Sequence, residues 1–209
     1  QVGADRRPRD RLLASAIEHS SVRGGGRFPA AGITEIRVTA AGVVDLAHLQ
    51  AELDTASARG ERVLVAVMAA NNETGVIQPV RAVADRVHAA GGLLHVDAVQ
   101  ACGRIAIDIN ALGADLLTVS AHKIGGPQGV GALVRRDQAL YFPDPLIKGG
   151  GQERGLRAGT ENVAGIVGFG AAAAAVRERL DREAAGMSGL RDRIESGLRA
   201  IAPHTVIFG

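Results

Sequence analysis

Residues 93–123 read LLHVDAVQACGRIAIDINALGADLLTVSAHK and contain two short apolar runs, at 93–96 and 116–119. Each run is nearly continuous instead of alternating, which is typical of strands buried on both faces of a parallel sheet. A third run of this kind, VLVAVMA, lies at 63–69. Between the runs, residues 79–90 carry valines and alanines at helical spacing. The rhythm of strand, helix and strand predicts an α/β fold with a mostly parallel sheet flanked by helices.

Further elements are expected on both sides of this segment. Residues 45–59 have leucines at helical spacing and predict an amphipathic helix. Residues 131–134 predict another strand in an antiparallel position, because only a tight Gly-Pro-Gln-Gly link precedes them. The Ala-rich stretch 161–202 predicts helix, with a break expected at the glycines of 186–189. Residues 205–208 resemble the beginning of a new strand, so a domain is expected to follow.

Composition narrows the class of protein. The 209 residues are 46% hydrophobic, which is enough for one sizeable core. The 24 basic and 22 acidic residues are spread along the chain and give a net charge of +2, so no nucleic-acid footprint is expected. The Arg-rich residues 6–11 are interpreted as a solvated terminus rather than a basic arm. No metal site is predicted.

The compartment is predicted from what the sequence lacks. No apolar run reaches the roughly 18 residues of a membrane span, and no apolar segment of a secretory signal is evident. Cys102 is the single cysteine, which is compatible with a reducing compartment. A cytoplasmic protein without membrane association is therefore the expectation.

Polar residues follow each of the three apolar runs. In open α/β sheets, ligands bind beyond the carboxyl ends of the strands. Any one of these polar residues alone could be a helix cap or a turn residue, but three such groups at equivalent positions favour a binding site. The residues concerned are Asn71, Asn72, Asp97, Gln100, Ser120, His122 and Lys123.

Lysine usage makes Lys123 the most informative of these residues. Only two of the 24 basic residues are lysines, Lys123 and Lys148. Arginine stays protonated, whereas a desolvated lysine can lose its proton and attack a carbonyl. Lys123 therefore fits a lysine that forms an imine. A surface lysine on a loop remains an equal alternative on composition alone.

Asp97 and the later glycine-rich stretch suggest what such a lysine would hold. A carboxylate at the end of a buried strand is costly unless it is paired with a cation, and the pyridinium nitrogen of pyridoxal phosphate (PLP) is one. A helix N-cap is the competing interpretation of Asp97. Ser120 and His122 can donate hydrogen bonds to a phosphate, and residues 148–160, KGGGQERGLRAGT, approach a predicted helix start as anion sites do.

Four motifs follow one another along the chain: NNETGVIQP (71–79), HVDAVQACG (95–103), SAHKIGGPQGVGAL (120–133) and GGGQERGLRAGTEN (149–162). In this order and spacing they resemble the class V aminotransferase superfamily, and within it most closely the cysteine desulfurases.

The resemblance extends from about Leu13 to the end of the chain. It implies the large domain of an aspartate aminotransferase-like, PLP-dependent transferase, incomplete at both ends. Residues 1–189 would be a partial PLP-binding large domain. Residues 190–209 would be a linker helix and the first strand of a truncated C-terminal small domain.

The resemblance also implies roles around the cofactor ring. Lys123 would hold PLP covalently and move protons on the substrate, and Asp97 would pair with the ring nitrogen. Gln100 would hydrogen-bond the phenolic oxygen of the ring. His19, in SAIEHSSVR, would stack on the ring and assist acid–base steps. Without the resemblance His19 would be interpreted as an ordinary capping or surface histidine.

Other implied roles concern the phosphate and the substrate. Ser120 and His122 would hold the phosphate, and Asn72 would lie near the ring and the substrate carboxylate. Thr160 resembles a threonine that reaches the phosphate of the neighbouring subunit, which implies a homodimer with shared sites.

The implied activity is that of iron–sulfur cluster assembly enzymes, which remove sulfur from L-cysteine. The products are L-alanine and a persulfide on an acceptor cysteine, which is expected to be absent from this chain, so the chain as given is expected to be inactive. Cys102 is interpreted as a buried structural thiol. A sulfur-acceptor or scaffold protein is the implied partner. The alternatives are another class V enzyme, such as a selenocysteine lyase or an aminotransferase, and a non-catalytic remnant.

Overall fold

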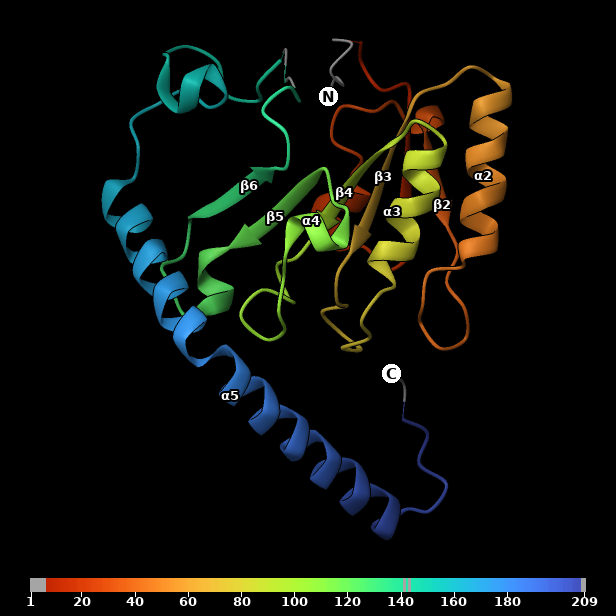
Figure 1. Ribbon diagram of the computed structural model, residues 1–209, viewed down its shortest axis with the longest axis vertical. Coiled ribbons are helices and arrows are strands. Elements are labelled where there is room, and N and C mark those ends of the chain that lie inside the picture. Colours follow the sequence, from red (N-terminus) through yellow and green to blue (C-terminus); the bar gives the residue numbers. More distant parts are fainter. Residues whose placement is uncertain (1–6, 141, 143, 208–209) are drawn as a thin grey trace.

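The computed structural model describes residues 7–140, 142 and 144–207, and its described part is built around one sheet (Figure 1). The strand order is β2-β1-β3-β4-β5-β6, with β6 antiparallel to β5 and every other neighbouring pair parallel. The predicted α/β fold with a mostly parallel sheet is confirmed, as is the antiparallel position of residues 131–134. The strands are β1 (Arg11–Ser15), β2 (Ile33–Ile36), β3 (Val63–Met68), β4 (Leu93–Asp97), β5 (Leu116–Ser120) and β6 (Gly131–Arg135).

Helices α2 and α3 cover one face of this sheet (Figure 1). Both were predicted from the spacing of their apolar residues. Asp45 caps α2, because its carboxylate accepts hydrogen bonds from the backbone nitrogens of Ala47 and His48, each at 3.0 Å. The helices are α1 (Ser20–Arg23), α2 (Leu46–Ala58), α3 (Val80–Ala89), α4 (Ile109–Leu112) and α5 (Val163–Ile201), with short 3-10 turns η1 (Ala30–Gly32), η2 (Ala121–Ile124) and η3 (Gln152–Gly155).

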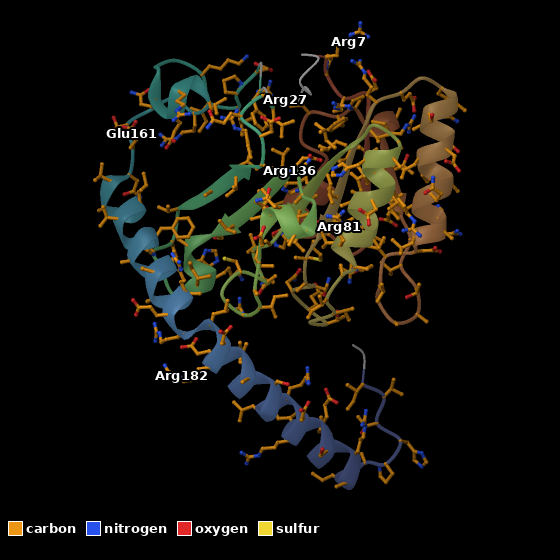
Figure 2. The ribbon with its side chains drawn as sticks, in the orientation of Figure 1. Arg7, Arg27, Arg81, Arg136, Glu161 and Arg182 are labelled. Atoms are coloured by element: carbon orange, nitrogen blue, oxygen red, sulfur yellow. The ribbon has the colours of Figure 1, made fainter. Side chains whose placement is uncertain are left out.

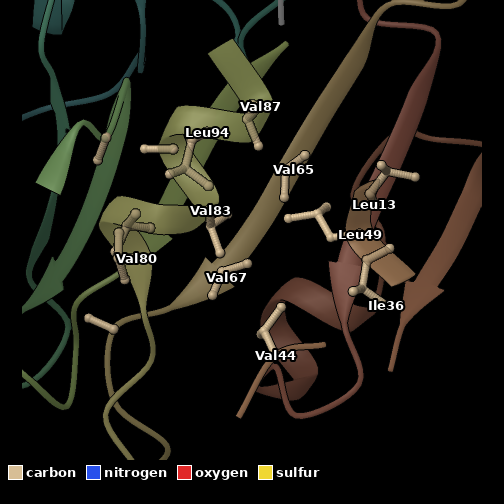
Figure 3. Close-up of a cluster of buried hydrophobic side chains, with 14 of the residues drawn as sticks. Leu13, Ile36, Val44, Leu49, Val65, Val67, Val80, Val83, Val87 and Leu94 are labelled. Atoms are coloured by element: carbon tan, nitrogen blue, oxygen red, sulfur yellow. The ribbon is translucent and has the colours of Figure 1, made fainter. Parts of the chain in front are cut away.

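The main core lies between the sheet and these helices (Figure 3). All six residues of β3 are buried, since this strand is central and both of its faces are covered. Successive side chains of a strand point to opposite faces. Leu13 accordingly joins the main core, while Leu12 and Ala14 join a smaller cluster on the other face. Burial on both faces explains why the central strands are continuously apolar.

Arg11 is more ordered than the sequence suggested. Arg11 is the first residue of β1, and its Nε donates a hydrogen bond of 2.6 Å to Oε2 of Glu61. The interpretation of 6–11 as a solvated terminus is therefore wrong for Arg11, while Arg6 lies outside the described residues. The strands β1 and β2 were not predicted.

The long helix α5 corrects two further expectations. It continues through Gly186 and Gly189 without the break predicted at 186–189, and residues 205–207 form no strand within the described part of the chain; Phe208 lies outside that part. The domain boundary placed after residue 189 stays a prediction. Figure 2 labels Arg182 on the part of α5 that projects past the sheet. Among the described residues, no helix combines the length and apolar character needed to cross a membrane.

Asp115 ties the amino-terminal end of the sheet together. It is only 4% exposed and precedes β5. Its Oδ2 accepts a hydrogen bond of 2.8 Å from the backbone nitrogen of Leu94 and lies 2.9 Å from Nε2 of His88, and its Oδ1 pairs with Arg136. One carboxylate thus links α3, β4 and the residue that follows β6.

Replacing Asp115 with Ala is expected to lower the free energy of unfolding by about 2–4 kcal/mol, because the buried Leu94 amide and the Arg136 guanidinium lose their partner. Urea unfolding measures this change. Asp85→Ala is the matched control, since the Asp85–Arg81 pair is more than half exposed, and its expected cost is below about 1 kcal/mol. Equal costs for the two variants would contradict the assignment.

Candidate active site

The carboxyl ends of the parallel strands surround a cavity of about 360 Å³. Strand pairing sets this arrangement, because Met68 of β3 lies opposite Asp97 of β4, and Asp97 lies opposite Thr118 of β5. The loops that leave these strands therefore start side by side. The cavity is lined by His19, Ser21, Met68, Asn72, Asp97, Val99, Gln100, Ser120, His122 and Lys123.

Two of the predicted residues, Asn71 and Thr160, do not line this cavity. Thr160 is exposed and lies between η3 and α5. The glycine-rich stretch 148–160 as a whole contributes no lining residue. The anion site predicted there is thus separate from the cavity. The residues brought together are His19, Asn72, Asp97, Gln100, Ser120, His122 and Lys123.

Asp97 has one carboxylate oxygen engaged and one available. It is 6% exposed, and its Oδ1 accepts a hydrogen bond of 2.9 Å from the backbone nitrogen of Val99. No hydrogen bond from the described residues reaches Oδ2. The competing helix-cap interpretation is wrong, since a turn and not a helix follows Asp97. A buried carboxylate oxygen at a cavity wall is suited to a cationic N–H of a ligand.

Lys123 differs sharply from the second lysine of the chain. Lys123 lines the cavity, and among the described residues its amine makes no hydrogen bond or ion pair. Lys148, by contrast, pairs with Asp144 on the surface. Lys123 lies in η2, directly after β5, where Gly125 ends the turn with a φ of 84°. An unpaired amine facing a cavity is available to react with an electrophilic ligand.

Two histidines stand at the cavity with one ring nitrogen already engaged. Nδ1 of His122 lies 2.9 Å from Oγ of Ser120. His19 is the N-cap of α1, and its Nδ1 accepts a hydrogen bond of 3.2 Å from the backbone nitrogen of Ser21. The capping interpretation of His19 is therefore compatible with a place in the site. In both rings this leaves Nε2 without a partner among the described residues.

Glu18 and Asn71 hold the turn that carries His19, and sequence reasoning did not single out Glu18. Nδ2 of Asn71 donates a hydrogen bond of 3.1 Å to the carbonyl of Ile17. Glu18 is 4% exposed, and its Oε1 accepts hydrogen bonds from Oγ of Ser15 at 2.5 Å and from the backbone nitrogen of Met68 at 2.6 Å. Burial, and then the charge of Asp97, raise the pKa of Glu18 to about 7.

Beside the first cavity lies a wider hollow of about 790 Å³. His19 and Asn72 line both, so these two residues form the boundary between them. Glu18, Asn71 and Glu73 line the hollow but not the cavity.

Cys102 takes no part in the cavity. It is partly buried, and burial raises the pKa of its thiol, an effect that nearby Arg104 partly offsets. The thiolate is the reactive form of cysteine, so this environment makes Cys102 a poor nucleophile at neutral pH. The geometry agrees with the structural thiol expected from the sequence.

Comparisons with known proteins agree with this geometry. The sequence model of the family described as "Aminotransferase class-V" matches residues 2–208. A cysteine desulfurase of Bradyrhizobium diazoefficiens is 43% identical over 193 residues, which cover 91% of this chain and 47% of that protein. The chain spans about half the length of the curated relatives it matches.

Solved structures give the same result. A NifS-like protein from Rickettsia africae superposes with a TM-score of 0.83 at 37% identity, over 91% of this chain and 52% of that one. A structure described as SspA in complex with cysteine superposes with a TM-score of 0.68 at 32% identity, over 79% of this chain and 47% of that one.

Cys102 is expected to react with iodoacetamide about tenfold more slowly than glutathione at neutral pH, because its raised pKa leaves little thiolate. The rate should keep rising with pH beyond the range in which an ordinary thiol has become fully ionised. Mass spectrometry of the alkylated chain measures it, and the urea-unfolded chain is the control. A native rate equal to the unfolded rate at neutral pH would contradict the burial argument.

Proposed function

The chain belongs to the class V aminotransferase family, and we propose that it is the cofactor-binding part of a PLP-dependent cysteine desulfurase. The observation that carries the proposal is the cavity that holds both an unpaired lysine amine, at Lys123, and an available buried carboxylate oxygen, at Asp97. These are the two groups that a pyridine aldehyde requires, and they come from neighbouring strands.

The residues present fit PLP. Lys123 would hold the aldehyde group, and Oδ2 of Asp97 would pair with the ring nitrogen. Gln100 would donate a hydrogen bond to the phenolic oxygen. Ser120 and His122 would donate to the phosphate from the end of β5 and the turn that carries the lysine. The cavity of about 360 Å³ lies within the usual range of small-molecule sites.

When bound, PLP supplies an electron sink that acidifies the Cα of an amino acid. The negative charge of Asp97 would keep the ring nitrogen protonated. Lys123 would accept a proton from the substrate and return it at its Nζ. His19 would stack on the ring and assist these proton transfers, and Asn72 would orient the substrate carboxylate at the boundary with the wider hollow.

L-Cysteine is the proposed substrate, and its sulfur goes to an acceptor thiolate while L-alanine is formed. Support comes from the desulfurase relatives and from the related structure described with cysteine. Within these 209 residues the one thiol is Cys102, which lies away from the cavity with a raised pKa. We therefore propose that these residues alone do not complete the desulfuration cycle.

The proposed assembly rests on the position of Thr160. Thr160 is exposed on the loop before α5, where it is free to contact a second subunit. We propose a cytoplasmic homodimer in which Thr160 reaches the phosphate of the neighbouring site. A sulfur-acceptor or scaffold protein of iron–sulfur cluster assembly would then take the sulfur.

Incubation with PLP is expected to give a yellow protein. Borohydride should then fix the label on the Lys123 peptide, because Lys123 is the one lysine among the described residues that lines the cavity. Peptide mass spectrometry locates the label. Lys123→Ala should lose it, whereas Lys148→Ala, which removes the surface lysine, should keep it. Asp97→Asn should weaken PLP binding by about tenfold or more, through loss of the ion pair. Labelling of Lys148 instead would contradict the site.

The purified 209-residue chain, loaded with PLP, is expected to form no sustained L-alanine and sulfide from L-cysteine in the presence of a reductant. The reason is the lack of a thiolate at the substrate sulfur. Amino-acid analysis and a sulfide assay measure the products, and L-selenocysteine and L-alanine complete the substrate panel. Continuous turnover by this chain would contradict the proposal.

A further inference from the structure

Glu18 is a buried carboxyl group that the proposed chemistry leaves unused. It directly precedes His19 in the turn between β1 and α1. Both of its hydrogen bonds converge on one oxygen, Oε1, from Ser15 and from the backbone of Met68. The other oxygen, Oε2, is buried and has no hydrogen-bond partner among the described residues. An unsatisfied buried carboxylate oxygen is costly, so a structural role alone does not account for a glutamate here.

The contacts of Glu18 reach the two sides of the cofactor cavity. Its backbone nitrogen donates a hydrogen bond of 3.1 Å to the carbonyl of Ser15, at the start of the segment that presents His19. Through Met68 it is bonded to the end of β3, and Met68 is the register partner of Asp97. Met68 itself lines the cavity. Glu18 therefore connects the residue assigned to the ring face with the residue assigned to the ring nitrogen.

We propose that Glu18 is a positioning residue of the cofactor site, which anchors the His19 turn to β3 and binds or releases a proton according to the charge at Asp97. The inference rests on the proposed function, because the charge at Asp97 changes when a cationic ring pairs with it. The field of Asp97 favours the neutral form of Glu18. A cationic ring paired with Asp97 would weaken this field and make it easier for Glu18 to release its proton.

The charged surroundings of Glu18 are asymmetric. Burial raises the pKa of Glu18 to about 7, and the charge of Asp97, from β4, adds to this rise. Ser15 of β1 and Met68 of β3 are uncharged and hydrogen-bond the carboxyl group. On the side of the wider hollow stand His19, Arg23 and Glu73. Hydrogen bonds from Ser15 and Met68 oppose the rise in pKa without cancelling it.

The first experiment uses the cofactor-free protein and therefore does not depend on PLP binding. Side-chain carboxyl signals of ¹³C-labelled glutamate are followed by NMR through neutral pH, and Glu18→Gln identifies the signal of Glu18. A midpoint near 7 is expected in the wild type, and a lower midpoint in Asp97→Asn, which removes the neighbouring charge. Glu73→Gln is the control and should leave the midpoint unchanged. A midpoint near 4.5, or no response to Asp97→Asn, would overturn the inference.

The stability of the same cofactor-free protein gives a second readout. The pKa of Glu18 is raised on folding from 4.5 to about 7, so the folded state binds more protons than the unfolded state in this window. The contribution of Glu18 to stability is therefore fully present below pH 4.5 and is lost as pH rises to about 7. The melting temperature of Glu18→Gln should gain on that of the wild type as pH rises from 4.5 to about 7, and then run parallel. A difference in melting temperature between the two proteins that stays constant over the whole pH range would contradict the raised pKa of Glu18.

The third readout is PLP affinity as a function of pH. Since ring binding favours ionised Glu18, wild-type affinity should rise relative to that of Glu18→Gln as pH increases through neutrality, by about tenfold for each unit by which the ring lowers the pKa of Glu18. Glu18→Ala also removes the anchor to Met68 and should bind PLP more weakly at every pH. A ratio of wild-type to Glu18→Gln affinity that does not change with pH would overturn the coupling.

These outcomes separate the inference from the proposed function. If the wild type fails to bind PLP at any pH, the proposed function is contradicted, while the cofactor-free titration still decides whether Glu18 responds to Asp97. If the wild type binds PLP at Lys123 and Glu18→Gln reproduces its pH dependence, the inference alone fails.

Discussion

Parallel pairing of β3 and β4 in one register is the constraint on which the site depends. It sets Met68 opposite Asp97, and the next pairing sets Asp97 opposite Thr118, two residues before β5 ends at Ser120. A shift of one residue would turn every side chain of a strand to the other face of the sheet. Asp97 would then enter the core instead of the cavity wall. The fully buried side chains of β3 fix this register on both faces, so the core and the site are determined together.

The position of Lys123 depends on a second kind of packing, between η2 and α5. A Cβ on Gly126 would approach the carbonyl oxygen of Ala121 to 3.0 Å and the Cβ of Ala172 in α5 to 3.3 Å. A Cβ on Gly103 would meet Ile124 at 2.9 Å and Val176 of α5 at 3.2 Å. Glycine at these positions lets the helix approach the turn closely. The turn that carries Lys123 therefore packs closely against α5, which suits a residue that must contact a ligand in a fixed geometry.

Burial alone did not decide which strands could be predicted, since β1 is almost fully buried and was missed while β6 is exposed and was predicted. β3 is continuously apolar, and β4 and β5 are nearly so, which made these strands conspicuous. In β2 the two middle residues are polar and only Ile36 is buried, so no apolar run stands out. Gly186 and Gly189 do not break α5. Each glycine costs about 1 kcal/mol relative to alanine in a helix, and the strong helix formers around them outweigh this cost.

The site residues were predictable where they lie near the end of an apolar run. Asp97 directly follows residues 93–96, and Lys123 lies four residues beyond the run 116–119 in a chain where lysine is rare. Glu18 was not, since nothing in the string SAIEHSS marks a glutamate as buried. Only the tertiary contact with Met68 reveals it.

The buried carboxylates of the chain show how the two ends of the sheet differ in purpose. Asp115, at the amino-terminal end, has partners on both oxygens from His88, Leu94 and Arg136. Its charge is compensated within the protein, as expected of a group that stabilises the fold. At the opposite end, Asp97 and Glu18 each keep one oxygen without a hydrogen bond from the described residues, and the charge of Asp97 adds to the cost of ionising Glu18. Buried carboxylate oxygens without partners make the empty site costly. A cation paired with Asp97 would give one of these oxygens a partner and weaken the field that acts on Glu18, so part of this cost would return as affinity for the ligand.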